Sequence, residues 1–108
     1  MTKIFLTQRE KLILRQIATS ETGYITRQDI SNRFRLSERS IKHTIQQLRK
    51  KGVPVMADRV QKKGYWLPKT EQERMFGLTP YRNQIQEELR ILNAMETSNL
   101  NYSYSLED

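Results

Sequence analysis

Residues 26 to 52 contain two short stretches with helical periodicity, joined by a tight turn. The hydroxyls of Thr26 and Ser37, which precede the two stretches, can accept hydrogen bonds from backbone N–H groups in the first turn of a helix. Gly52 stands where the second helix must end with a positive φ angle. Two helices joined so closely must cross and pack against each other, and this constrains how the rest of the chain can fold.

The second helix, which we expect from about residue 38 to about residue 51, has one apolar and one polar face. The apolar face consists of Ile41, Ile45 and Leu48. The opposite face carries Arg39, His43, Gln46 and Lys50, and it is flanked by Ser40, Lys42 and Gln47. A helix that reads the major groove of DNA needs such a row of donors, because its exposed side chains must reach base edges.

An ordinary solvated helix face is the other interpretation of the same row. Against it, Glu38 is the only acidic residue between Asp29 and Asp58, whereas exposed helices usually mix charges of both signs. The scarcity of acids favours contact with an acidic partner.

The two helices and the turn between them resemble the helix-turn-helix of the biotin-repressor-type winged-helix domains, which are common in bacterial transcription regulators. The residues that match the family's pattern are Asp29, Ile30, Ser31, Phe34, Leu36, Ser37, Ser40 and Ile41. Arg35 departs from the pattern, because it stands where glycine is usual. A side chain in a left-handed turn costs about 1 kcal/mol, so we expect a turn of slightly different shape. The resemblance continues in KGVPV and KKGYWL and covers roughly residues 5 to 68.

Beyond Gly52 the helical periodicity gives way to alternation, which predicts a β-hairpin. The expected strands contain Val53, Val55 and Asp58, and then Gly64, Tyr65, Trp66 and Leu67. The loop between them carries the cations Arg59, Lys62 and Lys63. Such a loop can clamp a phosphate backbone, since Lys and Arg displace condensed counterions there; an ordinary charged turn is the alternative. Tyr65 and Trp66 face opposite sides of the hairpin, so one of them must be inward.

The N-terminal segment supplies a third helix. Thr7 and Glu10 have the spacing of a capping box. The apolar face that follows consists of Leu12, Ile13, Leu14 and Ile17. Tyr24 and Ile25 can add a short strand beside the hairpin. We therefore predict an α+β fold, mainly α, with a winged helix-turn-helix over residues 1–68 that comprises three helices and a β-hairpin wing, and with an additional C-terminal helix.

Charge is divided unevenly along the 108 residues, whose net charge is +7 and whose pI is near 9.9. Residues 1 to 69 contain 16 Lys and Arg against 5 Asp and Glu, a net of +11. Residues 70 to 108 contain 3 against 7, a net of −4. The basic part coincides with the predicted DNA-binding domain, as binding to a polyanion requires.

The C-terminal third differs in pattern as well as in charge. We expect residues 69–96 to form a linker and an amphipathic helix from about Pro80 to about Met95, and residues 97–108 to form a disordered tail. The apolar stripe of this helix consists of Tyr81, Ile85, Leu89, Leu92 and Met95. A second copy of the chain can cover this stripe as a homodimer contact, or the stripe can lie on its own domain.

These features predict sequence-specific binding of double-stranded DNA by a small transcriptional regulator of bacterial or bacteriophage origin. The predicted DNA-binding residues are Arg27, Ser37, Arg39, Ser40, Lys42, His43, Gln46, Gln47, Lys50, Arg59, Lys62 and Lys63. The helix of residues 38–51 would enter the major groove, and the wing of residues 58–64 would lie on the backbone. The alternative is a protein-interaction module or a phage accessory factor in replication or genome packaging. Double-stranded RNA or single strands are further possibilities, but the narrow major groove of A-form RNA disfavours the first.

Enzyme function is not expected. His43 is the only histidine, cysteine is absent, and the acids are scattered without metal-ligand spacing. No apolar run approaches the ~20 residues that span a bilayer, and the N-terminus lacks the apolar region of a signal peptide, so we expect a cytoplasmic protein. We expect no cofactor, no metal and no small-molecule effector, because a sensing domain of about 100 residues would not fit beside the first domain.

Overall fold

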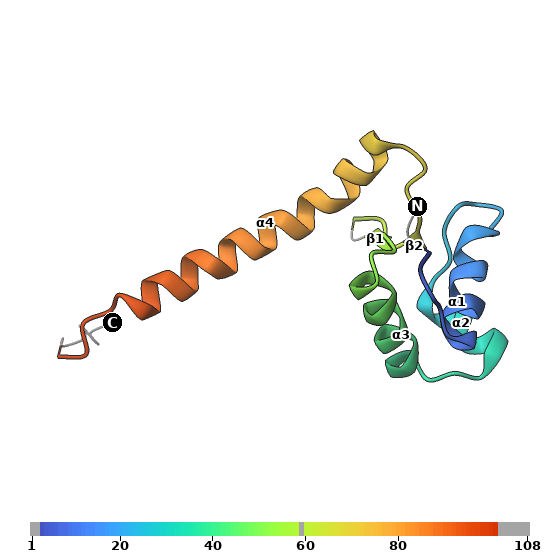
Figure 1. Ribbon diagram of the computed structural model, residues 1–108, viewed down its shortest axis with the longest axis horizontal. Coiled ribbons are helices and arrows are strands. Elements are labelled where there is room, and N and C mark those ends of the chain that lie inside the picture. The colour runs from blue at the N-terminus through green and yellow to red at the C-terminus, as the bar shows by residue number, and fades with distance from the viewer. Residues whose placement is uncertain (1–2, 59, 102–108) are drawn as a thin grey trace. The chain divides into compact units, whose positions relative to one another are not determined.

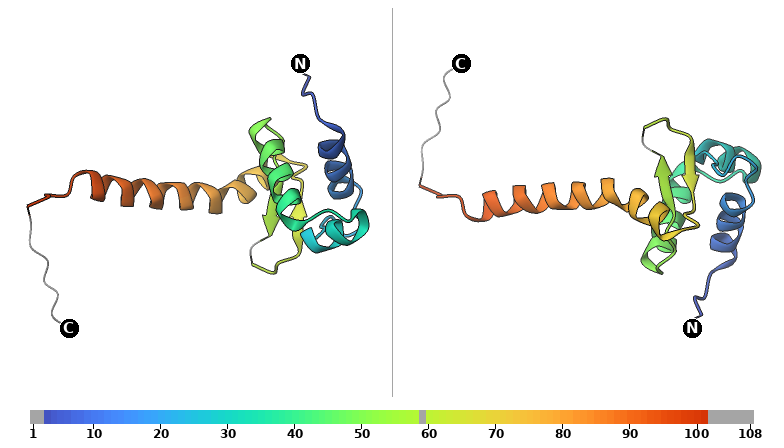
Figure 2. Two further views of the ribbon diagram at one scale, coloured as in Figure 1. Left: turned by 90° about the horizontal axis from the view of Figure 1, so that it is seen from below. Right: turned by 90° about the horizontal axis from the view of Figure 1, so that it is seen from above.

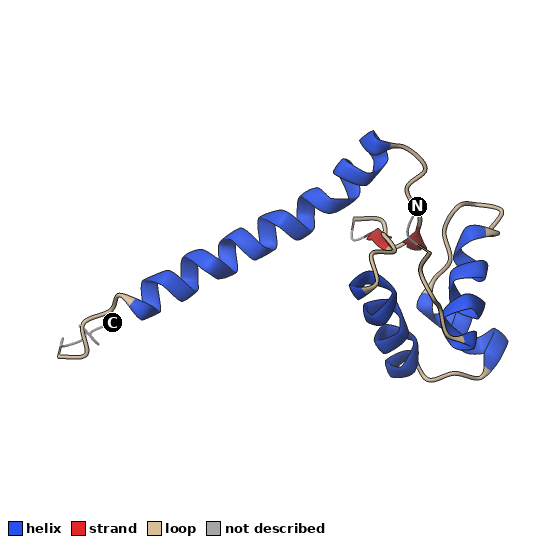
Figure 3. Cartoon of the chain, viewed as in Figure 1, coloured by secondary structure: helices blue, strands red, loops and turns tan. Residues whose placement is uncertain are grey.

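The computed structural model describes residues 3–58 and 60–101. Its elements are α1 (Gln8–Ala18), α2 (Arg27–Phe34), α3 (Glu38–Lys50), β1 (Met56–Asp58), β2 (Gly64–Trp66) and α4 (Glu71–Glu96) (Figure 1). The chain divides into two units, Met1–Gly77 and Leu78–Asp108. In the first unit, α1, α2 and α3 lie together beside the β1–β2 hairpin (Figure 2). The predicted winged helix-turn-helix, mainly α and with an additional C-terminal helix, is confirmed (Figure 3).

The predicted cap begins each of the first three helices. The Thr7 hydroxyl accepts from the backbone N–H of Glu10 at 3.2 Å, and the Glu10 carboxylate accepts from the N–H of Thr7 at 2.8 Å, which completes the capping box. Thr26 accepts from the N–H of Asp29 at 3.0 Å, and Ser37 accepts from that of Ser40 at 3.1 Å. These bonds satisfy backbone donors that no helical carbonyl can reach.

The turn between α2 and α3 is left-handed at Arg35, with φ 54° and ψ 37°. Glycine adopts this conformation without a steric penalty, whereas an arginine in it destabilises the fold by about 1 kcal/mol. The Ser31 hydroxyl spans the turn and donates a 2.6 Å hydrogen bond to the carbonyl of Leu36. This bond offsets part of the cost, and the tight connection is retained.

The core of the first unit lies where α1, α2 and α3 meet the hairpin. Its buried residues are Ile13, Ile17, Ile25, Ile30, Ile41, Ile45, Leu48, Val55 and Tyr65. All three residues of the predicted apolar face of α3 belong to it. On the hairpin Tyr65 is buried and Trp66 is half-buried, so Tyr65 is the inward residue of that pair.

The hairpin is shorter than predicted. It pairs Met56 with Trp66, Ala57 with Tyr65 and Asp58 with Gly64 in antiparallel register. The strand expected from Val53 begins only at Met56, because the N–H of Val53 bonds to the carbonyl of Leu48 and closes α3, and because Pro54 has no N–H to contribute. Leu67 likewise lies beyond β2.

Ile25 adds a single antiparallel bridge to the hairpin, in the place where a short third strand was predicted. Its N–H donates to the carbonyl of Tyr65 at 3.1 Å, and its carbonyl accepts from the N–H of Tyr65 at 2.8 Å. Gly64 makes this approach possible, since a Cβ on Gly64 would lie 2.2 Å from the Ile25 carbonyl oxygen. The bridge joins the segment before α2 to the hairpin.

Helix α4 begins at Glu71, so the prediction of a helix starting near Pro80 was wrong. The Thr70 hydroxyl accepts from the N–H of Glu73 at 3.1 Å, and this cap starts the helix nine residues before the proline. Pro80 fits the helical φ and costs one internal hydrogen bond without ending the helix. Residues 97–101 are not helical, and residues 102–108 of the predicted tail lie outside the described residues.

Gly77 is a point of close approach between the start of α4 and the hairpin. A Cβ on Gly77 would lie 2.7 Å from Cγ of Met56 and 3.2 Å from the Trp66 ring. The first turns of α4 therefore rest against β1 and β2 within the first unit.

Candidate nucleic-acid interface

The polar face of α3 is open to solvent along its length. Its four residues Arg39, His43, Gln46 and Lys50, which we call the ridge, are all exposed, and so is Lys42. Opposite them, Ile41 and Leu48 are 0% exposed and Ile45 is 1% exposed, so the helix is anchored along its whole apolar face. This places a row of hydrogen-bond donors, amide and imidazole included, on a rigid support.

Two predicted hydroxyls beside the ridge are already engaged. The Ser37 hydroxyl caps α3, and the Ser40 hydroxyl accepts a 2.9 Å hydrogen bond from Nη1 of Arg9. Gln47, on the same side of α3, is half-buried. Arg9 was not predicted as part of this surface, because its proximity to Ser40 depends on the packing of α1 on α3 and leaves no local signal.

Arg27, at the start of α2, is tied to the start of α3. Its Nε donates to Oε1 of Glu38 at 3.1 Å, and this hydrogen bond raises the pKa of Arg27 above its ordinary value. The ion pair is partly exposed and therefore contributes little stability. It does hold the Arg27 guanidinium beside the first turn of α3.

The tip of the hairpin is organised by Asp58. Its carboxylate accepts hydrogen bonds from the backbone N–H groups of Val60 at 3.2 Å and of Gln61 and Lys63 at 3.3 Å. Desolvation opposes ionisation of this carboxylate, but the N–H donors outweigh it and hold the pKa of Asp58 below its ordinary value. The loop carrying the predicted phosphate contacts is thus held by internal bonds, with Lys62 in a left-handed conformation.

The cations of the loop have different surroundings. Lys62 is exposed. Nζ of Lys63 lies 5.2 Å from the centre of the Tyr24 ring, a cation–π distance, and Tyr24 in turn packs on Trp66. The predicted contact Arg59 lies outside the described residues.

A concavity of about 340 Å³ joins the helix pair to the hairpin. Its lining includes Arg27 and Lys62, so the structure brings together one predicted contact from α2 and one from the wing. Glu38 and Asp58 line it as well, where they serve the Arg27 ion pair and the loop. The ridge of α3 is a separate surface of the same unit.

The predicted apolar stripe lies in the second unit and is open. No residue of α4 is buried, and Ile85, Leu89, Leu92 and Met95 are between 46% and 62% exposed. Tyr81 is half-buried, and Ile91, which lies outside the predicted stripe, is 51% exposed. The apolar surface of this helix is thus broader than the predicted stripe.

No group of His, Cys, Asp or Glu side chains that could hold a metal ion occurs within residues 3–58 and 60–101.

None of the described helices combines the length and the apolar character needed to cross a membrane.

Comparison with known families agrees with this geometry. The HTH domain family matches residues 9–65, from the first turn of α1 to the middle of β2. No curated protein and no solved structure matches the chain. The matched segment contains the ridge, the left-handed turn and most of the hairpin.

Proposed function

The chain belongs to the HTH domain family, and on this basis we propose that it binds double-stranded DNA sequence-specifically, as a small transcriptional regulator of the biotin-repressor type from a bacterium or a bacteriophage. In this proposal α3 enters the major groove and the hairpin lies on the phosphate backbone.

The exposed ridge of α3 is the observation that carries the proposal. Arg39 can donate two hydrogen bonds to O6 and N7 of a guanine, and Gln46 can form the corresponding pair with an adenine. His43 lies between these two residues along the row of donors, and Lys50 extends the row toward the C-terminal end of the helix. Because buried residues fix the opposite face, the ridge can be presented to DNA without rearrangement of the domain.

The wing supports the proposal through charge. Lys62 and Lys63 project cations from a loop that Asp58 holds in place, and a preorganised loop loses little entropy when it contacts phosphates. Arg27 adds a donor beside the same concavity. Residues 1 to 77 contain 17 Lys and Arg against 7 Asp and Glu, a net of +10 that favours approach to a polyanion.

We further propose that two copies associate through the stripe of α4, because four of its five side chains, Ile85, Leu89, Leu92 and Met95, are about half exposed or more. A two-fold dimer would bind a pseudo-palindrome whose half-sites lie about one helical turn, roughly 34 Å, apart.

Selection of bound sequences from a random duplex pool tests the proposal. The expected result is a consensus whose two halves are related by inverted symmetry. The double variant Arg39→Ala with Gln46→Ala should lose the consensus, whereas Lys69→Ala, which removes an exposed cation away from the ridge, should retain it. Recovery of no consensus by the wild-type chain would refute sequence-specific binding.

A further inference from the structure

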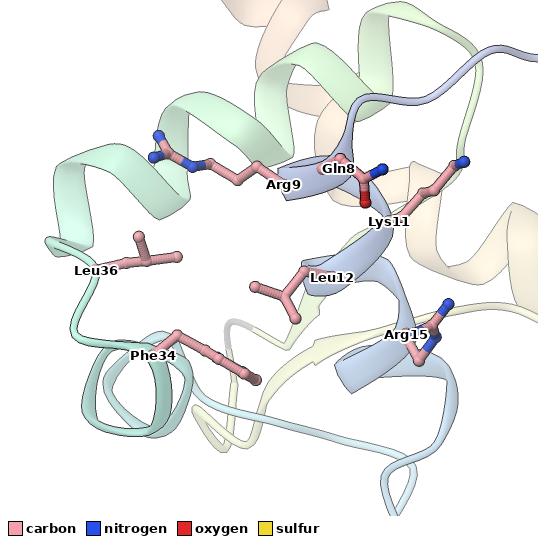
Figure 4. Close-up of a pocket in the computed structure, with 7 residues that line it drawn as sticks. All are labelled: Gln8, Arg9, Lys11, Leu12, Arg15, Phe34 and Leu36. Carbon is pink, nitrogen blue, oxygen red and sulfur yellow. The ribbon is translucent and has the colours of Figure 1, made fainter.

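A groove on the outward side of α1 has no role in the proposed function. It has a volume of about 450 Å³ and runs between α1 and the turn that joins α2 to α3 (Figure 4). Its lining includes Arg9, Lys11, Leu12, Arg15, Phe34 and Leu36.

The centre of the groove is apolar. Leu12 points from α1 toward Leu36 and Phe34, and all three side chains are only half-buried (Figure 4). On α1 the buried core residues are Ile13 and Ile17, with Leu14 packed against the core beside them, and Leu12 does not belong to this set. Three apolar side chains therefore leave carbon surface that a ligand can still remove from water.

The rim of the groove is basic. At helical spacing Arg9 lies on one side of Leu12, and Lys11 and Arg15 lie on the other. The groove lining contains no acidic residue. Glu10 is the only acid of α1, and it is bonded to Thr7 and Lys51 on the core side. The three rim cations thus have no carboxylate partner in the part of the chain that the structure describes.

The groove adjoins the ridge of α3 but does not contain it. Ser40, which receives the hydrogen bond from Arg9, is about 100° around α3 from Arg39. The groove lining includes none of the ridge residues Arg39, His43, Gln46 and Lys50. A ligand in the groove therefore leaves the proposed DNA-reading surface uncovered.

We propose that this groove docks an acidic amphipathic helix of another protein. Leucine-type side chains at positions i, i+3, i+4 and i+7 of that helix would cover Leu12, Phe34 and Leu36, and glutamates on its flanks would pair with Arg9, Lys11 and Arg15. The charge of the rim excludes basic peptides, and the apolar centre selects against acidic chains that lack apolar residues.

Two other ligands fit the surface less well. A phosphate backbone would use the rim cations, but it offers nothing to the three apolar side chains at the centre. A small molecule would be left largely in water, because the groove opens to solvent, whereas small-molecule sites enclose most of their ligand. A helix meets the chemistry of the groove, because it can offer apolar side chains to the centre and carboxylates to the rim.

A peptide titration tests this inference on the full chain. The probe is a fluorescein-labelled, acetylated and amidated peptide of about 16 residues with leucine at i, i+3, i+4 and i+7 and glutamate at most other positions. A peptide of the same composition, with its leucines spread around the helix, is the control. Fluorescence anisotropy is measured with and without a saturating DNA duplex, and the duplex is titrated separately.

The variants separate charge from apolar contact. The double variant Lys11→Glu with Arg15→Glu reverses the rim, and Lys3→Glu with Lys69→Glu makes the same change in net charge elsewhere on the first unit. Leu12→Gln replaces one of the three apolar side chains at the centre with a polar one while keeping a residue of high helix propensity. Circular dichroism verifies that each variant is folded, and the rim variant alters only exposed side chains.

The inference requires that the amphipathic peptide bind at least ~10-fold more tightly than its scrambled control. The rim variant and Leu12→Gln should each weaken it by ~10-fold or more, whereas the control double variant should not, and DNA should not displace the peptide. Equal binding of both peptides, or an unchanged affinity in the rim variant, overturns the inference. Displacement of the peptide by DNA would also overturn it. A loss of self-association in the rim variant would overturn it too, because the occupant of the groove would then be a second copy of the chain. The peptide signal does not depend on DNA binding, so failure of the proposed function would appear separately in the duplex titration.

Discussion

Nζ of Lys51, at the C-terminal end of α3, donates a 2.6 Å hydrogen bond to Oε1 of Glu10 in the first turn of α1. The same Glu10 oxygen accepts from the N–H of Thr7, and the same ammonium group donates to the carbonyl of Phe5 at 3.1 Å. Glu10 is only 4% exposed. One carboxylate thus completes the cap of α1 and joins α1 to the end of α3.

This relationship predicts a loss of stability in acid. The hydrogen bonds from Lys51 and Thr7 lower the pKa of Glu10 below its ordinary value of 4.5. The carboxylate therefore stabilises the fold fully above pH 4.5, and the contribution is lost as the pH falls through the lower pKa of the folded state. Melting temperatures measured between pH 3 and pH 7 should show this decline, and Glu10→Gln should make it shallower, with Asp58, whose pKa is also lowered, accounting for part of what remains. Glu21→Gln, which neutralises an exposed acid, should leave the wild-type curve unchanged.

The salt dependence of DNA binding tests the proposed phosphate contacts. If Lys42, Lys50, Lys62, Lys63 and two or three further cations each neutralise a phosphate, log K should fall against log[salt] with a slope of roughly −5 to −6. Anisotropy titrations of a labelled duplex at several salt concentrations give this slope. A slope near zero would contradict the DNA-binding proposal.

Base reading and backbone binding should separate between α3 and the wing. Arg39→Ala should cost about 1 to 3 kcal/mol on the selected sequence and relax the preference at one base pair. Lys62→Ala should weaken cognate and random duplexes alike and reduce the salt slope by about 1. Equal losses on both duplexes for both variants would remove Arg39 from base reading.

The proposed dimer contact is tested at Leu89. Leu89→Asp would place an unpaired charge in the seam at a cost of several kcal/mol, roughly 3 to 5, so dimers should dissociate. Sedimentation reports the mass, and Asn83→Asp adds the same charge on the opposite face of α4 as a control. A wild-type chain that is monomeric at tens of micromolar, with a lowered melting temperature in Leu89→Asp, would instead mean that the stripe packs within its own chain.

Two glycines allow backbone strain to be separated from steric conflict. Gly64 and Gly23 both have positive φ, at +113° and +84°, but a Cβ would meet the Ile25 carbonyl only at Gly64. Each alanine variant should lose about 1 kcal/mol from strain. Gly64→Ala should lose a further ~1 to 3 kcal/mol, because the bridge between Ile25 and Tyr65 must open. Urea denaturation measures both, and equal losses would contradict the clash at Gly64.

Signals that act within one turn of helix predicted much of the first unit. The hydroxyls of Thr7, Thr26 and Ser37 cap the helices that follow them, and the two faces of α3 are buried and exposed as its periodicity indicated. The glycine-like position of Arg35 is left-handed despite the arginine. In each case the conformation is set by interactions between residues that are close together in the chain, and these residues can be identified in the sequence directly.

Two kinds of feature were predicted less well, namely contacts between residues far apart in the chain and positions where two local signals compete. The hydrogen bond from Arg9 to Ser40 arises from the packing of α1 on α3, and the spacing of residues within either helix does not predict it. At Pro80, a local signal that usually marks a first helical turn was overridden by the Thr70 cap. The strand expected from Val53 is shorter because the N–H group of Val53 bonds to the carbonyl of Leu48 in α3 and is not available to a neighbouring strand. Which residues of the ridge contact bases remains a prediction.

The bridge between Ile25 and Tyr65 has a mechanical consequence. Ile25 immediately precedes the cap of α2, and Tyr65 stands in the middle of β2, so the two hydrogen bonds between them fasten the hairpin to the helix pair. If the wing and the ridge contact DNA as proposed, they would do so at a fixed spacing. A duplex whose groove width departs from that spacing would then engage only one of the two surfaces, and the protein would discriminate among sequences by the shape they impose on DNA as well as by their bases.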